Sequence, residues 1–299
     1  MTKITSFILA FTLSPLALVF TSIQGTTSPN IHTVNSMGSH NIVELFGCNK
    51  TTLSDLPKLE KIFIQAANLA GAKKIGVITH QTAEGINSCI VLVSESHLSI
   101  HAFPALDYAA IDIFTCGECD NEKAIAHIKQ QLQAQSNHSK KITRGIYKQG
   151  ISRSRYNPNK DNQKGEHLIV ELYGCEENII NDEKKIEEIL KKAVQKTGAQ
   201  IIDSVPYKFH PQGVSCIVLA KNGSQITIHT WPELSEKYCA IDILTCGNYK
   251  PDEAFLFLKK ELKGKTSHAI KIPRGFSPAG VVEQICPPED LTVTLTQPG

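Results

Sequence analysis

A Glu-Ser dipeptide lies between two apolar segments in the first half of the chain. One apolar run ends at Val93, and a second, in which apolar and polar residues alternate, begins at Leu98. This pattern predicts a strand, a tight turn containing Glu95 and Ser96, and a second strand. In a strained turn the serine hydroxyl can attack the preceding carbonyl carbon, whereas in a plain hairpin it does no chemistry. The local sequence leaves both interpretations open.

The chain contains two copies of one sequence. The segment His40–Cys48 matches His167–Cys175, and Ala110–Gly117 matches Ala240–Gly247, so the offset grows only from 127 to 130 residues. Two copies are too few for a solenoid and indicate a duplicated domain. We therefore expect repeat 1 at residues 37–145 and repeat 2 at 167–276. A polar linker, 146–166, would join them, and a proline-containing tail, 277–299, would follow.

Each repeat has the same expected layout of strands and helices. Apolar residues follow the helical spacing i, i+3, i+4, i+7, i+8 from Leu59 and again from Ile186. Alternating and fully apolar runs surround these helices, and a last helix is expected near 122–134 and 252–262. The fold class is therefore α+β. We expect two antiparallel sheets, each with helices on one face, in an αββα sandwich-like pseudo-dimer.

The composition excludes several classes of protein. The 299 residues carry a net charge of only +2, which gives no basic surface for nucleic acid. Six of the nine cysteines are three positions seen twice, so they do not form a disulfide framework. Cys116 and Cys119 have C-x-x-C spacing, but repeat 2 lacks the second cysteine, so we expect neither a zinc site nor a redox pair.

The first 36 residues contain an apolar run preceded by Lys3. A signal peptide or membrane anchor has this pattern. Met37 stands just before repeat 1, so an over-extended start is an alternative, and an ordered structural segment is a third.

Two motifs in repeat 1 resemble the pyruvoyl-dependent S-adenosylmethionine decarboxylases. They are G-I-N-S-C-I-V-L-V-S-E-S-H-L-S-I-H, ending at His101, and D-Y-A-A-I-D-I-F-T-C-G, ending at Gly117. Bacterial members of this family are single-unit homodimers, and eukaryotic members are a fused duplication. The resemblance implies that Ser96 attacks the Glu95 carbonyl, that the chain breaks, and that a pyruvoyl cofactor forms on residue 96. This group would bind the substrate amine as a Schiff base and act as an electron sink.

The resemblance also assigns roles to other residues. Cys116 would protonate the substrate carbon, and self-processing would use a serine and a histidine. Either Ser88 and His101 of the same repeat, or Ser215 and His229 across the interface, could fill this role. The asymmetric losses between the repeats favour the second pair.

Repeat 2 differs at the turn and keeps other family residues. Its turn reads Lys-Asn-Gly-Ser, which predicts an ordinary hairpin, although Ser224 is chemically able to cleave the chain. Cys246 is then expected to be a buried core thiol. By resemblance, Phe209 stacks on adenine and Glu233 holds the ribose hydroxyls, where repeat 1 has Thr82 and Ala105. Phe46 is a second candidate for adenine stacking, with a core role as the alternative.

The resemblance therefore implies decarboxylation of S-adenosylmethionine for polyamine biosynthesis. The alternatives are an ornithine or arginine decarboxylase of the same fold, and a non-catalytic homologue. We expect the cleaved chains to stay associated, with a homodimer as an open alternative. Because S-adenosylmethionine is made inside cells, the enzymology favours the cytoplasm, whereas the first 36 residues allow export or anchoring.

Overall fold

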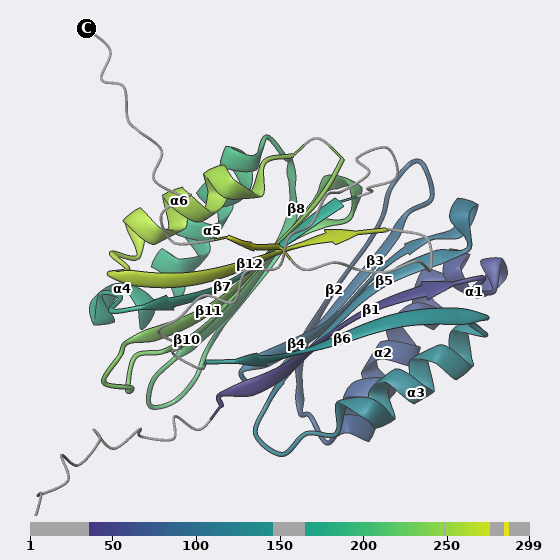
Figure 1. The fold of residues 1–299 in the computed structure, drawn as a ribbon, viewed down its shortest axis with the longest axis horizontal. Coiled ribbons are helices and arrows are strands. Elements are labelled where there is room, and N and C mark those ends of the chain that lie inside the picture. Colours follow the sequence, from purple (N-terminus) through teal and green to yellow (C-terminus); the bar gives the residue numbers. More distant parts are fainter. Residues whose placement is uncertain (1–35, 146–164, 248, 276–283, 287–299) are drawn as a thin grey trace, which may run out of the picture. The chain divides into compact units, whose positions relative to one another are not determined.

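The computed structural model describes residues 36–145, 165–247, 249–275 and 284–286. The expected leader, linker and tail lie almost entirely outside these residues. Figure 1 shows two sheets, each with helices on the face turned away from the other sheet. No helix in the described ranges is long and apolar enough to span a membrane.

Repeat 1 forms a six-stranded antiparallel sheet in the order β2-β3-β4-β5-β1-β6. Its elements are β1 (Gly38–Phe46), α1 (Lys50–Ser54), α2 (Leu56–Ala70), β2 (Lys74–Gln81), β3 (Asn87–Val93), β4 (Ser96–Phe103), the 3-10 turn η1 (Pro104–Leu106), β5 (Tyr108–Cys116), α3 (Asn121–Leu132) and β6 (Ser136–Arg144).

Repeat 2 forms a second antiparallel sheet in the equivalent order, with one short strand added at its edge. The order over the described residues is β13-β12-β7-β11-β10-β9-β8. Its elements are β7 (Gly165–Tyr173), α4 (Glu177–Ile180), α5 (Glu183–Thr197), β8 (Ile201–Lys208), β9 (Val214–Ala220), the 3-10 turn η3 (Lys221–Gly223), β10 (Ser224–Trp231), β11 (Tyr238–Cys246), α6 (Pro251–Glu261), β12 (Thr266–Arg274) and β13 (Gln284–Cys286).

The long helices form where the apolar spacing predicts them. The Asp55 side chain caps α2 by accepting from the Lys58 amide, and Gly71 ends the helix with a left-handed φ of 84°. Asp182 and Gly198 do the same for α5. The predicted apolar residues of both helices are buried against the sheets, so this prediction is confirmed.

The inner faces of the two sheets pack against each other. Alternate residues of β3 serve the two sides: Val91 belongs to the core under α2, whereas Ile90 and Leu92 join Ile217 and Leu219 of repeat 2. A second cluster joins Ile42 of β1 to residues of β7 and β12. The layers are therefore helix, sheet, sheet, helix, which confirms the predicted αββα architecture.

Candidate active site

The turn between β3 and β4 holds Glu95 and Ser96 as the sequence predicts. β3 ends at Val93 and β4 begins at Ser96. Glu95 has a φ of 56°, in the left-handed region, which costs a non-glycine residue about 1 kcal/mol. The peptide bond between these residues therefore lies at a locally strained position.

Cys116, at the end of β5, contacts both sides of this peptide bond. The Cys116 amide donates to Ser96 Oγ at 2.9 Å, and its Sγ donates to the Glu95 carbonyl oxygen at 3.3 Å. Burial raises the pKa of the Cys116 thiol to about 12, so the thiol is protonated at neutral pH. It can therefore donate a proton or stabilise a negative charge on the Glu95 oxygen, but it does not act as a thiolate.

The serine-histidine pair of repeat 1 lies at the other end of its hairpin. Ser88 Oγ and His101 Nδ1 are 2.9 Å apart, and these residues face each other across β3 and β4. His101 is five residues along β4 from Ser96, which corresponds to roughly 16 Å at the usual rise of a strand. The pair therefore does not lie at the Glu95–Ser96 bond of its own repeat.

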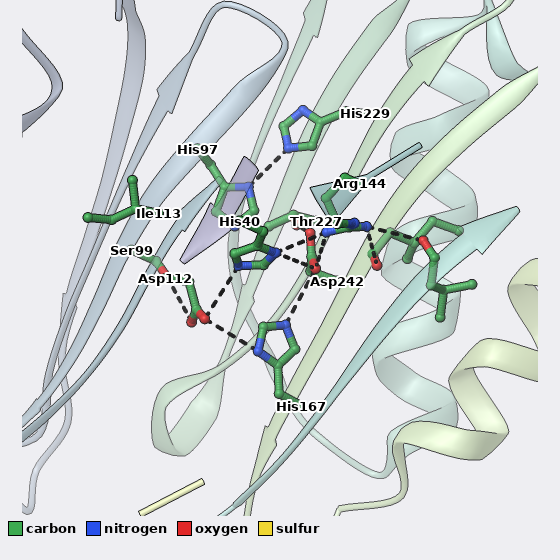
Figure 2. A network of polar contacts seen from close by, with 12 residues as sticks. His40, His97, Ser99, Asp112, Ile113, Arg144, His167, Thr227, His229 and Asp242 are labelled. Carbon is green, nitrogen blue, oxygen red and sulfur yellow. Dashed lines mark hydrogen bonds and ion pairs between the residues drawn. The ribbon is translucent and has the colours of Figure 1, made fainter. Parts of the chain in front are cut away.

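The serine-histidine pair of repeat 2 does reach the first turn. Ser215 Oγ and His229 Nδ1 are 2.7 Å apart, and His229 Nε2 is 3.0 Å from Nδ1 of His97, the residue after Ser96. Figure 2 shows the contact between the edges of the two imidazoles, whose ring centroids are 5.3 Å apart and whose planes differ by only 11°. Residues 132 positions apart in the sequence thus meet one residue beyond the predicted cleavage bond.

Burial keeps both imidazoles of this contact neutral. It lowers the pKa of His97 to about 4 and holds that of His229 well below the usual value. A neutral imidazole accepts a proton, so His229 can serve as a base at neutral pH.

The two predicted substrate-binding residues lie in the sheet of repeat 2, at the end that carries Ser215 and His229. Phe209 follows β8 and is half-buried, with its amide donating to Gly213, just before β9. Glu233 follows β10 and is exposed. Beside them, Trp231 packs in one apolar cluster with Phe114 and Cys116 of repeat 1.

Phe46 does not lie at this end of the molecule. Gly38 of β1 is opposite Cys116, whereas Phe46 is opposite Tyr108 and stacks on it at 5.4 Å. Eight residues of strand, about 26 Å, separate Phe46 from Gly38. The strand register therefore places Phe46 near the turn of repeat 2, where its contact with Tyr108 favours the alternative core role over adenine stacking.

Cys246 is also placed differently from the prediction. It is not a core thiol: its Sγ donates to the Gly223 carbonyl at 3.4 Å, and its amide donates to Ser224 Oγ at 3.0 Å. Both contacts repeat those of Cys116, because β11 ends beside the turn of repeat 2 as β5 does beside the turn of repeat 1.

A buried network of charged residues joins the two sheets beside the first site (Figure 2). His40 and His167 both lie between Asp112 and Asp242, at 3.4–3.6 Å. Arg144 pairs with Asp242 at 2.9 Å and with Glu171, and its guanidinium stacks over Phe114. The described residues hold no group of three or more metal-ligating side chains in a suitable arrangement.

The arginines control the charge of this network. Burial alone would raise the pKa of Asp112 and Asp242, but Arg274 and Arg144, respectively, hold both values well below the usual range. No role was predicted for these residues from the sequence. A signal was present, because an aspartate stands in the apolar run Ala-Ile-Asp-Ile of both repeats.

The family model described as S-adenosylmethionine decarboxylase matches residues 39–145 and, a second time, residues 166–275. The chain belongs to the S-adenosylmethionine decarboxylase family. The S-adenosylmethionine decarboxylase proenzyme of Moorella thermoacetica is 42% identical over 132 residues, which cover 44% of this chain and 97% of that protein. The corresponding proenzyme of Methanococcus maripaludis is 40% identical over 123 residues, or 41% of this chain and 98% of its own length.

The chain is also similar to a solved structure. The crystal structure of the adenosylmethionine decarboxylase from Aquifex aeolicus covers 40% of this chain and 99% of its own, with 24% identity and a TM-score of 0.36. The proenzyme relatives span about one repeat each, so this member of the S-adenosylmethionine decarboxylase family carries two such units in one chain.

Proposed function

We propose that this chain cleaves itself between Glu95 and Ser96 and then decarboxylates S-adenosylmethionine, a step of polyamine biosynthesis. The observation that carries the proposal is the contact between His97 and His229. It brings the Ser215–His229 pair of repeat 2 to the residue that follows Ser96, whose hydroxyl accepts from the Cys116 amide. Family membership supports the reaction, since the matched relatives are decarboxylase proenzymes.

Self-cleavage uses the contacts at the turn. Ser96 Oγ attacks the Glu95 carbonyl carbon, and the Cys116 thiol stabilises the negative charge that develops on the carbonyl oxygen. The peptide nitrogen leaves as an amine, so an ester replaces the amide. Relief of the left-handed strain at Glu95 favours this step.

The ester is then broken by elimination. His229, oriented by Ser215, accepts the proton from the Cα of residue 96. The Glu95 carboxylate leaves with the former serine oxygen, and residue 96 becomes an enamine. One water then replaces its nitrogen, which leaves as ammonia and produces a pyruvoyl group at the new N-terminus.

The site fits such a group. Residue 96 is buried beside the protonated Cys116 thiol, and the burial excludes competing water. When present, the pyruvoyl ketone supplies the electron sink for loss of carbon dioxide. Cys116 holds the proton that the substrate carbon needs afterwards. Its raised pKa keeps that proton in place until it is required.

Recognition of the nucleoside falls to repeat 2. The half-buried ring of Phe209 offers an aromatic face for adenine, and the exposed Glu233 carboxylate offers acceptors for the two ribose hydroxyls. An ornithine or arginine substrate would need neither residue.

The cleaved chains are expected to stay associated. The cut falls between β3 and β4, which remain paired in one sheet, and β4 is also paired with β5. The proposed activity places the folded repeats where S-adenosylmethionine is made, inside the cell.

Intact-mass analysis of the full chain tests this proposal. We expect a cut between residues 95 and 96 and a blocked N-terminus at residue 96. Ser96→Ala should abolish this cut and the release of carbon dioxide from S-adenosylmethionine. Ser94→Ala, at an exposed position of the same turn, is the matched control and should keep both. An intact Glu95–Ser96 bond in folded protein, or release from ornithine or arginine alone, would contradict the proposal.

A further inference from the structure

The turn of repeat 2 holds its serine in the same geometry as the turn of repeat 1. Ser224 Oγ accepts from the Cys246 amide at 3.0 Å, and Ser96 Oγ accepts from the Cys116 amide at 2.9 Å. The Cys246 thiol donates to the Gly223 carbonyl oxygen at 3.4 Å, against 3.3 Å for the first site. The Gly223–Ser224 bond therefore has both a positioned hydroxyl and a donor on its carbonyl oxygen.

A serine-histidine pair also faces this turn, and it comes from repeat 1. Ser88 Oγ lies 2.9 Å from His101 Nδ1, and His101 Nε2 lies 3.2 Å from Gln225 Oε1, next to Ser224. The Gln225 oxygen can only accept, so Nε2 carries the hydrogen and Nδ1 is free to accept from Ser88. The imidazole is thus held in the tautomer that a base requires.

Gly223 brings this base against the bond. A Cβ added to Gly223 would lie 3.1 Å from His101 Nδ1, so only a residue without a side chain allows this approach without displacement. Burial lowers the pKa of His101 to about 4 and raises that of Cys246 to about 12, so the base is neutral and the thiol is protonated. Both groups are in the same ionisation state as their counterparts at the first site.

We propose that the Gly223–Ser224 bond is a second self-cleavage site, served by Ser88 and His101 of repeat 1. Ser224 Oγ attacks the Gly223 carbonyl carbon, and an ester replaces the amide. His101 accepts the Cα proton of residue 224, and the Gly223 carboxylate leaves with the serine oxygen. One water enters and one ammonia leaves, so residue 224 becomes a second pyruvoyl terminus. This step does not require cleavage at Ser96.

The second cleavage is expected to be slower than the first. Gly223 adopts its φ of 76° without the steric cost that Glu95 carries, so less strain is released on attack. A strain difference of this size corresponds to a slowing of roughly fivefold. The surrounding residues also differ, since Thr82 and Ala105 stand where repeat 2 has Phe209 and Glu233. A pyruvoyl group at residue 224 is therefore not expected to add activity on the nucleoside.

The test is intact-mass analysis of the full chain and of its Ser96→Ala variant, incubated for roughly 100 half-lives of the first cleavage. Both should yield a fragment that begins at residue 224, is blocked to Edman degradation and reacts with phenylhydrazine. Ser224→Ala should lose this fragment alone. Ser88→Ala should slow its formation by about 100-fold, while cleavage at Ser96 at the usual rate reports that the variant is folded.

Three outcomes would overturn the proposal. They are the absence of the fragment in both chains, its formation at an unchanged rate in Ser88→Ala, and a cut after Asn222 that leaves a free amino group on residue 223. Failure of the two proposals is distinguishable. A Ser96→Ala chain that cuts only at residue 224 supports this site whatever the first site does, and a wild-type chain that cuts only at residue 96 removes it.

Discussion

The turns of the two repeats share their hydrogen bonds and differ in the residues around them. In each, the serine hydroxyl accepts from a cysteine amide, and that cysteine's thiol donates to the carbonyl before the serine. Glu95 in the first turn is replaced by Gly223 in the second, and the residue that contacts the base changes from His97 to Gln225. The difference lies in strain and substrate contacts, whereas the arrangement for cleavage is common to both.

Each turn is contacted by a histidine of the other repeat, and in the proposed mechanism this crossing accounts for the pattern of losses. Residues on β9 and β10 face the turn of repeat 1, and residues on β3 and β4 face the turn of repeat 2. Thr82 and Ala105 therefore lie on the side that serves Ser224. Under the proposed function, repeat 1 does not need an aromatic and an acidic residue at these positions for nucleoside binding at Ser96.

The largest expected effect comes from replacing each of the two proposed bases by alanine. His229→Ala should slow cleavage at Ser96 by at least ~100-fold, because a positioned base contributes that much or more. His101→Ala should leave that rate unchanged and affect only Ser224. Mass spectrometry of freshly translated chain, sampled over time, measures both rates. A loss of Ser96 cleavage in folded His101→Ala alone would show that each repeat uses its own histidine.

Removing a network arginine should destabilise the fold by about 3–5 kcal/mol, because it leaves buried carboxylates unpaired. Arg144→Ala leaves Asp242 and Glu171 without their arginine partner, and Arg274→Ala does the same to Asp112 and Glu44. Urea unfolding of the Ser96→Ala, Ser224→Ala chain measures both losses without cleavage.

The same two variants test whether each arginine affects only the turn that lies nearest to it. Arg144 stacks on Phe114, whose ring contacts His229, so Arg144→Ala should also slow cleavage at Ser96 more than Arg274→Ala does. Equal slowing by the two variants would show that the network acts on both turns as one unit.

Acid should weaken both sites through their buried histidines. His97 and His101 have a folded pKa of about 4, below the unfolded value of about 6.5, so between these values the unfolded chain binds more protons. Above pH 6.5 these imidazoles are neutral in both the folded and the unfolded chain, and the fold has its full stability. This stability is lost as the pH falls toward 4. Each histidine contributes about 3 kcal/mol across this window.

Urea unfolding at several pH values measures this slope in the chain that lacks both cleavage serines. His101→Gln should flatten it by about one proton, or about 1.4 kcal/mol per pH unit. His210→Gln, at an exposed position, is the control. An unchanged slope in His101→Gln would mean that this imidazole is solvated or charged in the folded protein.

The smallest effect concerns the substrate contact that repeat 1 lacks. Glu233→Gln should raise the KM for S-adenosylmethionine by about tenfold and change kcat little, because a charge-assisted hydrogen bond to the ribose becomes a neutral one. Glu236→Gln, in the same exposed turn, should leave KM unaltered. An effect on kcat alone would place Glu233 outside the binding contact.

Much of this architecture follows from sequence pattern. The apolar spacing around Leu59 and Ile186 predicts α2 and α5, and the alternation around Val93 and Leu98 predicts the hairpin that holds Ser96. The duplication predicts two similar sheets. These features depend on local periodicity and on internal comparison, both of which a single sequence contains.

Tertiary structure decided which residues share a site. Ser88 and His101 are closest to Ser96 in sequence, yet the hairpin register places them roughly 16 Å away along the strand. Register likewise places Phe46 opposite Tyr108 and far from Cys116, which its residue type alone does not reveal. His97 and Gln225 went unassigned because their importance comes only from the facing sheet.

The sequence by itself therefore determined the elements, the duplication and the serine that the proposed chemistry uses. Only the packing of one sheet on the other determined that His229 meets the turn of repeat 1 and His101 the turn of repeat 2. The physical reason is that the two repeats face each other in opposite senses. The strand ends that hold the turn in one repeat therefore lie against the strand ends that hold the base in the other.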